Sequence, residues 1–94
     1  MNVIIDNNTL PLIEEAIVNS GKPAIRIKEA ACGCGGLLLE IMPDDVSPDD
    51  ECVVDNKIMI VADKSISFYF DNALITHKET INGNKFKLKT QSPQ

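Results

Sequence analysis

Apolar positions near the start of the chain recur every three to four residues, the period of an α-helix. The residues with this spacing are Leu10, Ile13, Ala16 and Ile17. Asn8 or Thr9 precedes them as a helix N-cap, and Pro11 suits the first turn. Gly21 is the type of residue at which helices commonly end. We therefore expect an N-terminal helix, preceded by a short strand in residues 2–5.

Further along, apolar and charged residues alternate with the period of two that is typical of strands. In residues 24–28, Ile25 and Ile27 share one face and charged residues occupy the other, which predicts a strand with one face in water. Residues 37–42 are apolar enough for a mostly buried strand. The intervening residues 30–36 contain closely spaced glycines and predict a loop.

The middle of the chain predicts a hairpin and then an ambiguous segment. Residues 51–54 and 58–62 have the pattern of short strands around a turn at residues 55–57. In residues 63–70 the apolar positions fit a strand, but they also fit a helix capped by Asp63. Periodicity alone leaves helix and strand open for this segment.

A second hairpin is predicted after this segment. Residues 73–81 and 85–89 flank Asn82-Gly83, a strong signal for a two-residue hairpin turn. Phe86 and Leu88 would face inward in the second strand. The lysines that alternate with them would blunt an exposed sheet edge; they are Lys85, Lys87 and Lys89.

These elements predict an α+β fold in one small domain over residues 1–90. It would contain short mixed or antiparallel strands, the N-terminal helix and a second short helix. The elements do not alternate as β-α-β units, so a doubly wound parallel sheet is not expected. Residues 91–94 should form a flexible tail.

Composition and charge exclude several function classes. The net charge of −5 and the four aromatic residues disfavour a nucleic-acid partner, which requires basic surfaces or stacking rings. No apolar run approaches the ~20 residues that span a bilayer, and the N-terminus has no secretory pattern. We expect a cytoplasmic protein without a membrane partner.

Cys32-Gly33-Cys34-Gly35-Gly36 is the one concentrated group of chemically reactive residues. Thiolates bind iron–sulfur clusters and other thiophilic metals, which usually take four such ligands. The missing pair would come from a second copy in a homodimer. Two alternatives stay open: incidental cysteines in a loop, and a dithiol that cycles to a strained disulfide.

The other candidate ligands favour structural roles. Cys52 lies among valines and is expected to be a small core residue. His77 is the single histidine, and a surface or packing role is favoured over metal ligation. The acids and prolines of residues 43–50 predict a solvated connection rather than a cation site. No arrangement of nucleophile and base is evident, so an enzyme is not expected.

The order of these parts resembles the HesB/IscA-like iron–sulfur biosynthesis domain, also called the A-type carrier, over residues 8–88. The matching parts are Gly21-Lys22-Pro23, the strand 24–28, Gly33-Cys34-Gly35-Gly36, the strand 37–42, the Pro-Asp-Asp turn, residues 57–65 and the hairpin ending at residues 82–88. The resemblance implies a short helix at residues 64–70.

The resemblance also implies a carrier that holds iron or an iron–sulfur cluster, often at a dimer interface, and passes it to recipient proteins of cluster assembly. Cys34 matches the first cysteine of the family. The C-terminal Cys-Gly-Cys of the family has no counterpart here, because no cysteine follows Cys52. Two hypotheses result: Cys32 and Cys34 bind a cluster or iron between two chains, or the chain is an interaction module without a metal.

Overall fold

The computed structural model of the 94-residue chain describes residues 1–30 and 38–90. Its helices and strands are β1 (Val3–Ile5), α1 (Leu10–Ser20), β2 (Ala24–Ala30), β3 (Leu38–Asp44), β4 (Asp50–Asp55), β5 (Ile58–Asp63), α2 (Lys64–Ser67), β6 (Ala73–Thr80) and β7 (Gly83–Thr90). The predicted α+β class and the order of the elements are confirmed. The predicted tail, residues 91–94, lies outside the described residues.

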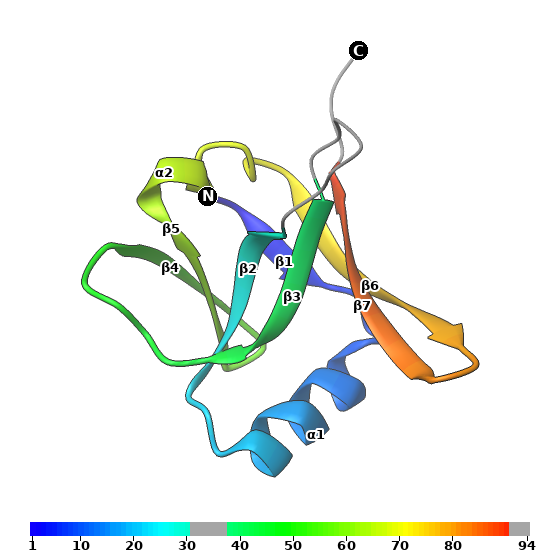
Figure 1. The fold of residues 1–94 in the computed structure, drawn as a ribbon. Coiled ribbons are helices and arrows are strands. Elements are labelled where there is room, and N and C mark those ends of the chain that lie inside the picture. The colour runs from blue at the N-terminus through cyan, green and yellow to red at the C-terminus, as the bar shows by residue number, and fades with distance from the viewer. Residues whose placement is uncertain (31–37, 91–94) are drawn as a thin grey trace.

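The strands form two mixed sheets. One has the order β1-β6-β7 and the other the order β3-β2-β5-β4. Two of the pairings are parallel, β1 with β6 and β2 with β5, and the other pairings are antiparallel. In Figure 1 the two sheets face each other, with α1 closing one end and α2 lying at the other.

Helix α1 forms as its sequence predicts. Pro11 lies in the first turn, and Thr9 occupies the N-cap position. Gly21 ends the helix in the left-handed region at φ +71°, where its amide N–H donates to the carbonyl of Ile17. Ile13 is fully buried, so this face of the helix covers the core.

The core lies between the inner faces of the two sheets. Ile25 and Ile27 of β2 are fully buried there, as the alternation predicted. Phe86 and Leu88 of β7 are half-buried against the same cluster. In β2 and β7 core-facing residues therefore alternate with outward residues, whereas Ile60, Val61 and Ala62 of β5 are buried on both faces.

The two hairpin turns differ in an informative way. Asn56 and Lys57 form the first turn with positive φ angles of 52° and 68°, the left-handed conformation of a two-residue hairpin. The second turn is one residue earlier than predicted, because Thr80 pairs with Gly83 and the loop is Ile81-Asn82. Gly83 carries the positive φ of 115° as the first residue of β7.

The ambiguous segment is a helix, and it is shorter than the implied 64–70. The side chain of Asp63 caps α2 by accepting a hydrogen bond from the amide of Ser65 at 2.8 Å. The helix ends at Ser67, and Phe70 then turns into the core with 1% of its surface exposed. Beyond Ser67 the chain continues in turns, in which the amides of Tyr69 and Phe70 donate to the carbonyls of Ile66 and Ser67.

Side chains join β1 to β4, which belong to different sheets. The amide of Ile5 donates to Asp55 Oδ2 at 2.9 Å, and the α-ammonium of Met1 lies 2.6 Å from Glu51 Oε2. Ser67 Oγ donates to the second oxygen of Glu51 at 2.7 Å. The ammonium, followed by the Ser67 hydroxyl, lowers the pKa of Glu51. These contacts close one seam between the sheets.

Candidate functional site

The residues predicted to carry chemistry, Cys32, Gly33, Cys34, Gly35 and Gly36, lie outside the described residues. Their flanks are described: β2 ends at Ala30, β3 begins at Leu38, and these two residues pair in register. Figure 1 shows the end of β2, the start of β3, the end of β7 and α2 at the same end of the molecule. The five residues therefore remain a prediction of the sequence.

Cys52 is exposed, so its predicted place in the core is wrong. It belongs to β4, where Val53 packs against the core and its two neighbours consequently point outward. Its register partner on β5 is Val61, which lies beside Arg26 of β2. The alternation in residues 51–54 was too short to show which parity faces inward.

Cys52 is also distant from the cysteine segment. It lies two strands across the sheet and four residues along it from Ala30, a separation of about 16 Å from ordinary strand spacings. Two extended residues, the step from Ala30 to Cys32, cover at most about 7 Å. Cys52 is therefore not adjacent to the base of the segment and is a suitable control thiol.

His77 has the packing role that its sequence context favoured. Its Nδ1 lies 2.8 Å from the hydroxyl oxygen of Thr9, and Thr9 is fully buried. This hydrogen bond fixes the start of α1 to β6, and Thr9 uses its side chain here rather than to cap the helix. Residues 1–30 and 38–90 contain no group of three histidine, cysteine or acidic side chains arranged for a metal ion.

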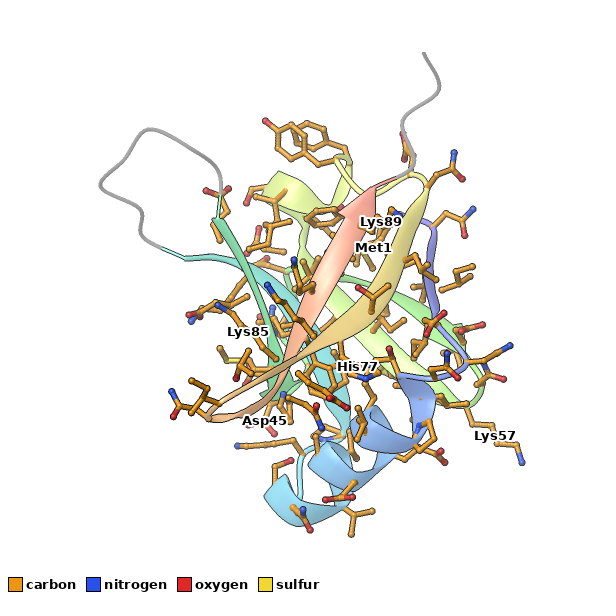
Figure 2. The ribbon with its side chains drawn as sticks, turned by 90° about the vertical axis from the view of Figure 1, so that its right-hand side faces the viewer. Met1, Asp45, Lys57, His77, Lys85 and Lys89 are labelled. Atoms are coloured by element: carbon orange, nitrogen blue, oxygen red, sulfur yellow. The ribbon has the colours of Figure 1, made fainter. Side chains whose placement is uncertain are left out.

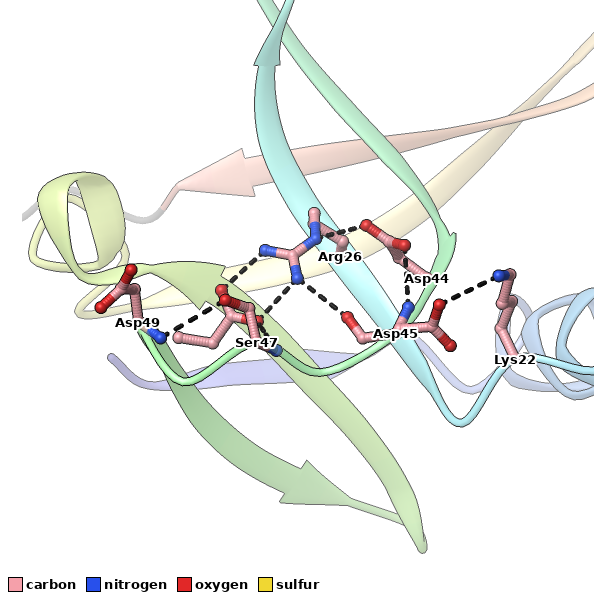
Figure 3. A network of polar contacts seen from close by, with 7 residues as sticks. Lys22, Arg26, Asp44, Asp45, Ser47 and Asp49 are labelled. Carbon is pink, nitrogen blue, oxygen red and sulfur yellow. Dashed lines mark hydrogen bonds and ion pairs between the residues drawn. The ribbon is translucent and has the colours of Figure 1, made fainter.

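The connection between β3 and β4 is mostly exposed, as predicted, but its two ends form an ion-pair network with Arg26 that was not predicted (Figure 3). Arg26 Nε donates to Asp44 at 2.6 Å, and both terminal nitrogens of Arg26 donate to Asp50 at 2.7 and 2.6 Å. Arg26 also donates to the carbonyl of Asp45 at 2.9 Å. Lys22 pairs with the Asp45 carboxylate at 3.1 Å. Both strands extend into the network, since β3 reaches Asp44 and β4 starts at Asp50.

The network shifts the protonation of its members. Only 1% of the Asp50 side chain and 14% of the Arg26 side chain are exposed. The hydrogen bonds from Arg26, and then the amide of Ser47, lower the pKa of Asp50. The amide of Asp45, and then Arg26, lower the pKa of Asp44. The bond to Asp50 contributes most to raising the pKa of Arg26. Arg26, Lys22 and the three aspartates of the network thus each have a partner of opposite charge.

An open groove of about 430 Å³ lies between β3 and the β6–β7 hairpin. Its lining residues are Glu40, Ile41, Met42, Thr80, Asn82, Gly83, Asn84, Lys85 and Phe86. The groove contains one carboxylate, the single thioether of Met42 and no thiol or imidazole, so it offers only one soft ligand to a thiophilic metal.

The described fold has a helix between β1 and β2, two facing mixed sheets and a short helix between β5 and β6, and the solved IscA and SufA structures show it to be the HesB/IscA-like fold. The predicted resemblance is confirmed at the level of architecture. No protein-family model matches the sequence, and no curated protein matches it.

Three solved structures illustrate the similarity in fold. IscA with a [2Fe–2S] cluster has a TM-score of 0.77 at 14% identity, with 95% of this chain and 85% of IscA covered. SufA of Escherichia coli, involved in biosynthesis of iron–sulfur clusters, has a TM-score of 0.77 at 11% identity over 96% and 86%. A protein from Aquifex aeolicus solved by NMR has a TM-score of 0.70 at 19% identity over 93% and 89%. At these identities the likeness establishes the fold.

Among the described residues, no helix is long and apolar enough to cross a membrane. The longer of the two helices, α1, has 11 residues.

Proposed function

We propose that this chain binds an iron–sulfur cluster, or iron, through the thiolates of Cys32 and Cys34 and takes part in cluster assembly or delivery. The observation that carries the proposal is the position of this thiol pair, between β2 and β3 of an IscA-like fold. IscA holds a [2Fe–2S] cluster in its solved structure, and SufA is involved in cluster biosynthesis.

The donor set fits half of a cluster site. Two thiolates per chain suit iron–sulfur chemistry, which usually takes four. The described residues offer no third cysteine near Ala30, because Cys52 lies about 16 Å away. A second copy of the chain would supply the missing pair, so the proposal includes a homodimer. Recipient or assembly proteins would be its other partners.

The proposed role is that of a carrier, not an enzyme. The cluster or iron is cargo, and the protein supplies thiolates and a scaffold without a reaction of its own. Reduced thiols are required, which makes a cytoplasmic setting part of the proposal.

Anaerobic reconstitution with iron and sulfide tests this function. The parent should gain visible absorption with matching iron and sulfide content, at the molecular mass of a dimer. Cys34→Ser should lose most of the bound iron and sulfide. Cys52→Ser, an exposed thiol on another strand, is the matched control and should bind as much as the parent. Equal binding by Cys34→Ser would overturn the proposal.

The second candidate is an interaction module without a metal. It is favoured by the number of thiols in residues 30–36, which is two where a cluster usually takes four. This function requires the same melting curve with and without a chelator, and for a Cys32→Ser/Cys34→Ser variant. A loss of stability on chelation would exclude it, because a metal that binds the folded state stabilises that state.

A further inference from the structure

Four lysines gather on the outer face of the β6–β7 hairpin. Lys85, Lys87 and Lys89 follow one another on the outward face of β7, and Lys78 of β6 stands opposite Lys85. All four are exposed. Lys85 and Lys89, about 13 Å apart by strand rise, are labelled in Figure 2. We call these four residues the lysine face.

The lysine face contrasts with the rest of the chain. It holds four of the nine basic residues, while the chain as a whole carries 14 acidic ones. In residues 1–30 and 38–90, the ion pairs formed by lysine, arginine and the N-terminus involve none of the four. These charges are therefore available to a partner.

The pairing of Lys78 with Lys85 acts against the stability of the sheet. Like charges directly opposite each other on neighbouring strands destabilise a sheet. At Lys78 the described residues pair β6 with β7 alone, because β1 pairs only with Ala73–Ile75. Protection of an open edge therefore accounts for a lysine on either strand, but not for two lysines directly opposite each other. A local conflict of this kind is typical of a functional surface.

The same outer face has an apolar end. Ile4 of β1, Leu74 of β6 and Lys89 of β7 lie side by side in register. Ile4 is 52% exposed. A shallow hollow of about 70 Å³ opens there, lined by Asn2, Ile4, Asn72, Ala73 and Leu74. A hollow of this size suits one small apolar group beside the row of charges.

We propose that the lysine face and the Ile4–Leu74 hollow together bind an acidic segment of another protein, with carboxylates on the lysines and one apolar side chain in the hollow. This surface contains no residue of the cysteine segment, so the inference is independent of cluster binding.

Three other occupants fit less well. A twofold contact between copies would set lysines against lysines. A nucleic acid extends beyond a patch of about 13 Å and would meet the acidic remainder of the surface, and its phosphates give the hollow no apolar group. An anionic membrane would meet the same acidic surroundings. A short acidic protein segment matches both the length and the chemistry.

Fluorescence anisotropy with the full chain tests the proposal. The probe is a fluorescein-labelled peptide of glutamates around one leucine, at low ionic strength. We expect Lys85→Gln/Lys87→Gln/Lys89→Gln to weaken binding about tenfold, from three exposed charge contacts. The matched control, Lys28→Gln/Lys57→Gln/Lys64→Gln, removes the same charge elsewhere and should stay within about twofold.

A second part of the experiment tests the hollow. Ile4→Ser should weaken the leucine peptide about threefold and leave unchanged a peptide with glutamine in place of leucine. Equal weakening by the two lysine triples would overturn the proposal, since net charge alone would then explain binding. Tighter binding of single-stranded DNA or phosphatidylserine vesicles than of the peptide would also overturn it, as would no measurable binding of the peptide by the parent.

Discussion

The Arg26 network and the lysine face lie on different sheets, and their charged side chains differ in exposure and in ion pairing. On the four-stranded sheet, Arg26 is held by Asp44 and Asp50, and little of its side chain reaches solvent. On the three-stranded sheet, the four lysines stand exposed, and the described residues give them no carboxylate partner in an ion pair. Both sets of side chains point away from the core because successive residues of a strand point to opposite faces of the sheet.

Some charged side chains therefore stabilise the fold, and others remain available to a binding partner. Removing one member of a buried pair leaves its partner desolvated and uncompensated, which is strongly destabilising. Removing an exposed, unpaired charge changes little, and where like charges repel it brings a small gain. The Arg26 network and the lysine face therefore predict opposite responses to removal of a positive charge.

The largest effect is expected for Arg26→Met. Asp50, with 1% of its side chain exposed, would lose two hydrogen bonds to a cation, and the free energy of unfolding should fall by about 3 kcal/mol. Lys28→Met, two residues along the same face of β2, is the matched control and should change it by less than about 0.5 kcal/mol. Urea unfolding of both variants measures this, and similar losses would contradict the contrast.

Acid should remove the advantage of the Arg26 network. Folding lowers the pKa values of Asp44 and Asp50, so their contribution is present above the ordinary aspartate pKa and is lost as pH falls through the folded-state values. The stability difference between the parent and Arg26→Met should therefore be largest near neutral pH and shrink toward about pH 3. Urea unfolding across this range measures it. A constant difference would show that Arg26 acts only through packing.

A smaller gain is expected on the lysine face from Lys78→Glu. The substitution converts the repulsion across from Lys85 into an attraction and should raise the free energy of unfolding by about 0.5 kcal/mol at low salt. The gain should fade in about 1 M salt because the pair is exposed. Lys78→Gln separates relief of repulsion from new attraction, and its gain should be the smaller. Loss of stability in Lys78→Glu would refute the proposed conflict.

The smallest effect is expected for Lys85→Gln/Lys87→Gln/Lys89→Gln. With three exposed side chains changed and the core positions kept, the free energy of unfolding should stay within about 0.5 kcal/mol of the parent. Thermal and urea unfolding measure this, together with the peptide-binding assay. A loss above about 1 kcal/mol would mean that the lysines support the sheet, and the two faces would no longer contrast.

Local patterns predicted the elements because the information for them is local. The alternation around Ile25 and Ile27 identified β2, and the spacing around Ile13 with Gly21 identified α1. The early end of α2 could not be read in this way. The resemblance implied a helix to residue 70, but the local pattern contains no residue that marks its end at Ser67.

Local patterns also did not predict the charge network. Arg26 meets Asp44 and Asp50 across 18 and 24 residues of sequence, and only the register of four strands brings them together. Cys52 was misplaced because four residues of alternation do not reveal which side is inward. The Cys32 and Cys34 pair was identified from residue chemistry and remains a prediction.

The parallel pairing of β1 with β6 has a consequence for how the chain acquires its fold. Val3 and Ile5 find their partners 70 residues later, at Ala73 and Ile75. A strand made early in synthesis must therefore wait for most of the polypeptide before it can be incorporated. Such long-range closure raises the contact order, so folding should occur in milliseconds to seconds rather than microseconds. During that interval Val3 and Ile5 lack their sheet partner, which makes this N-terminal segment a natural target for chaperones during translation.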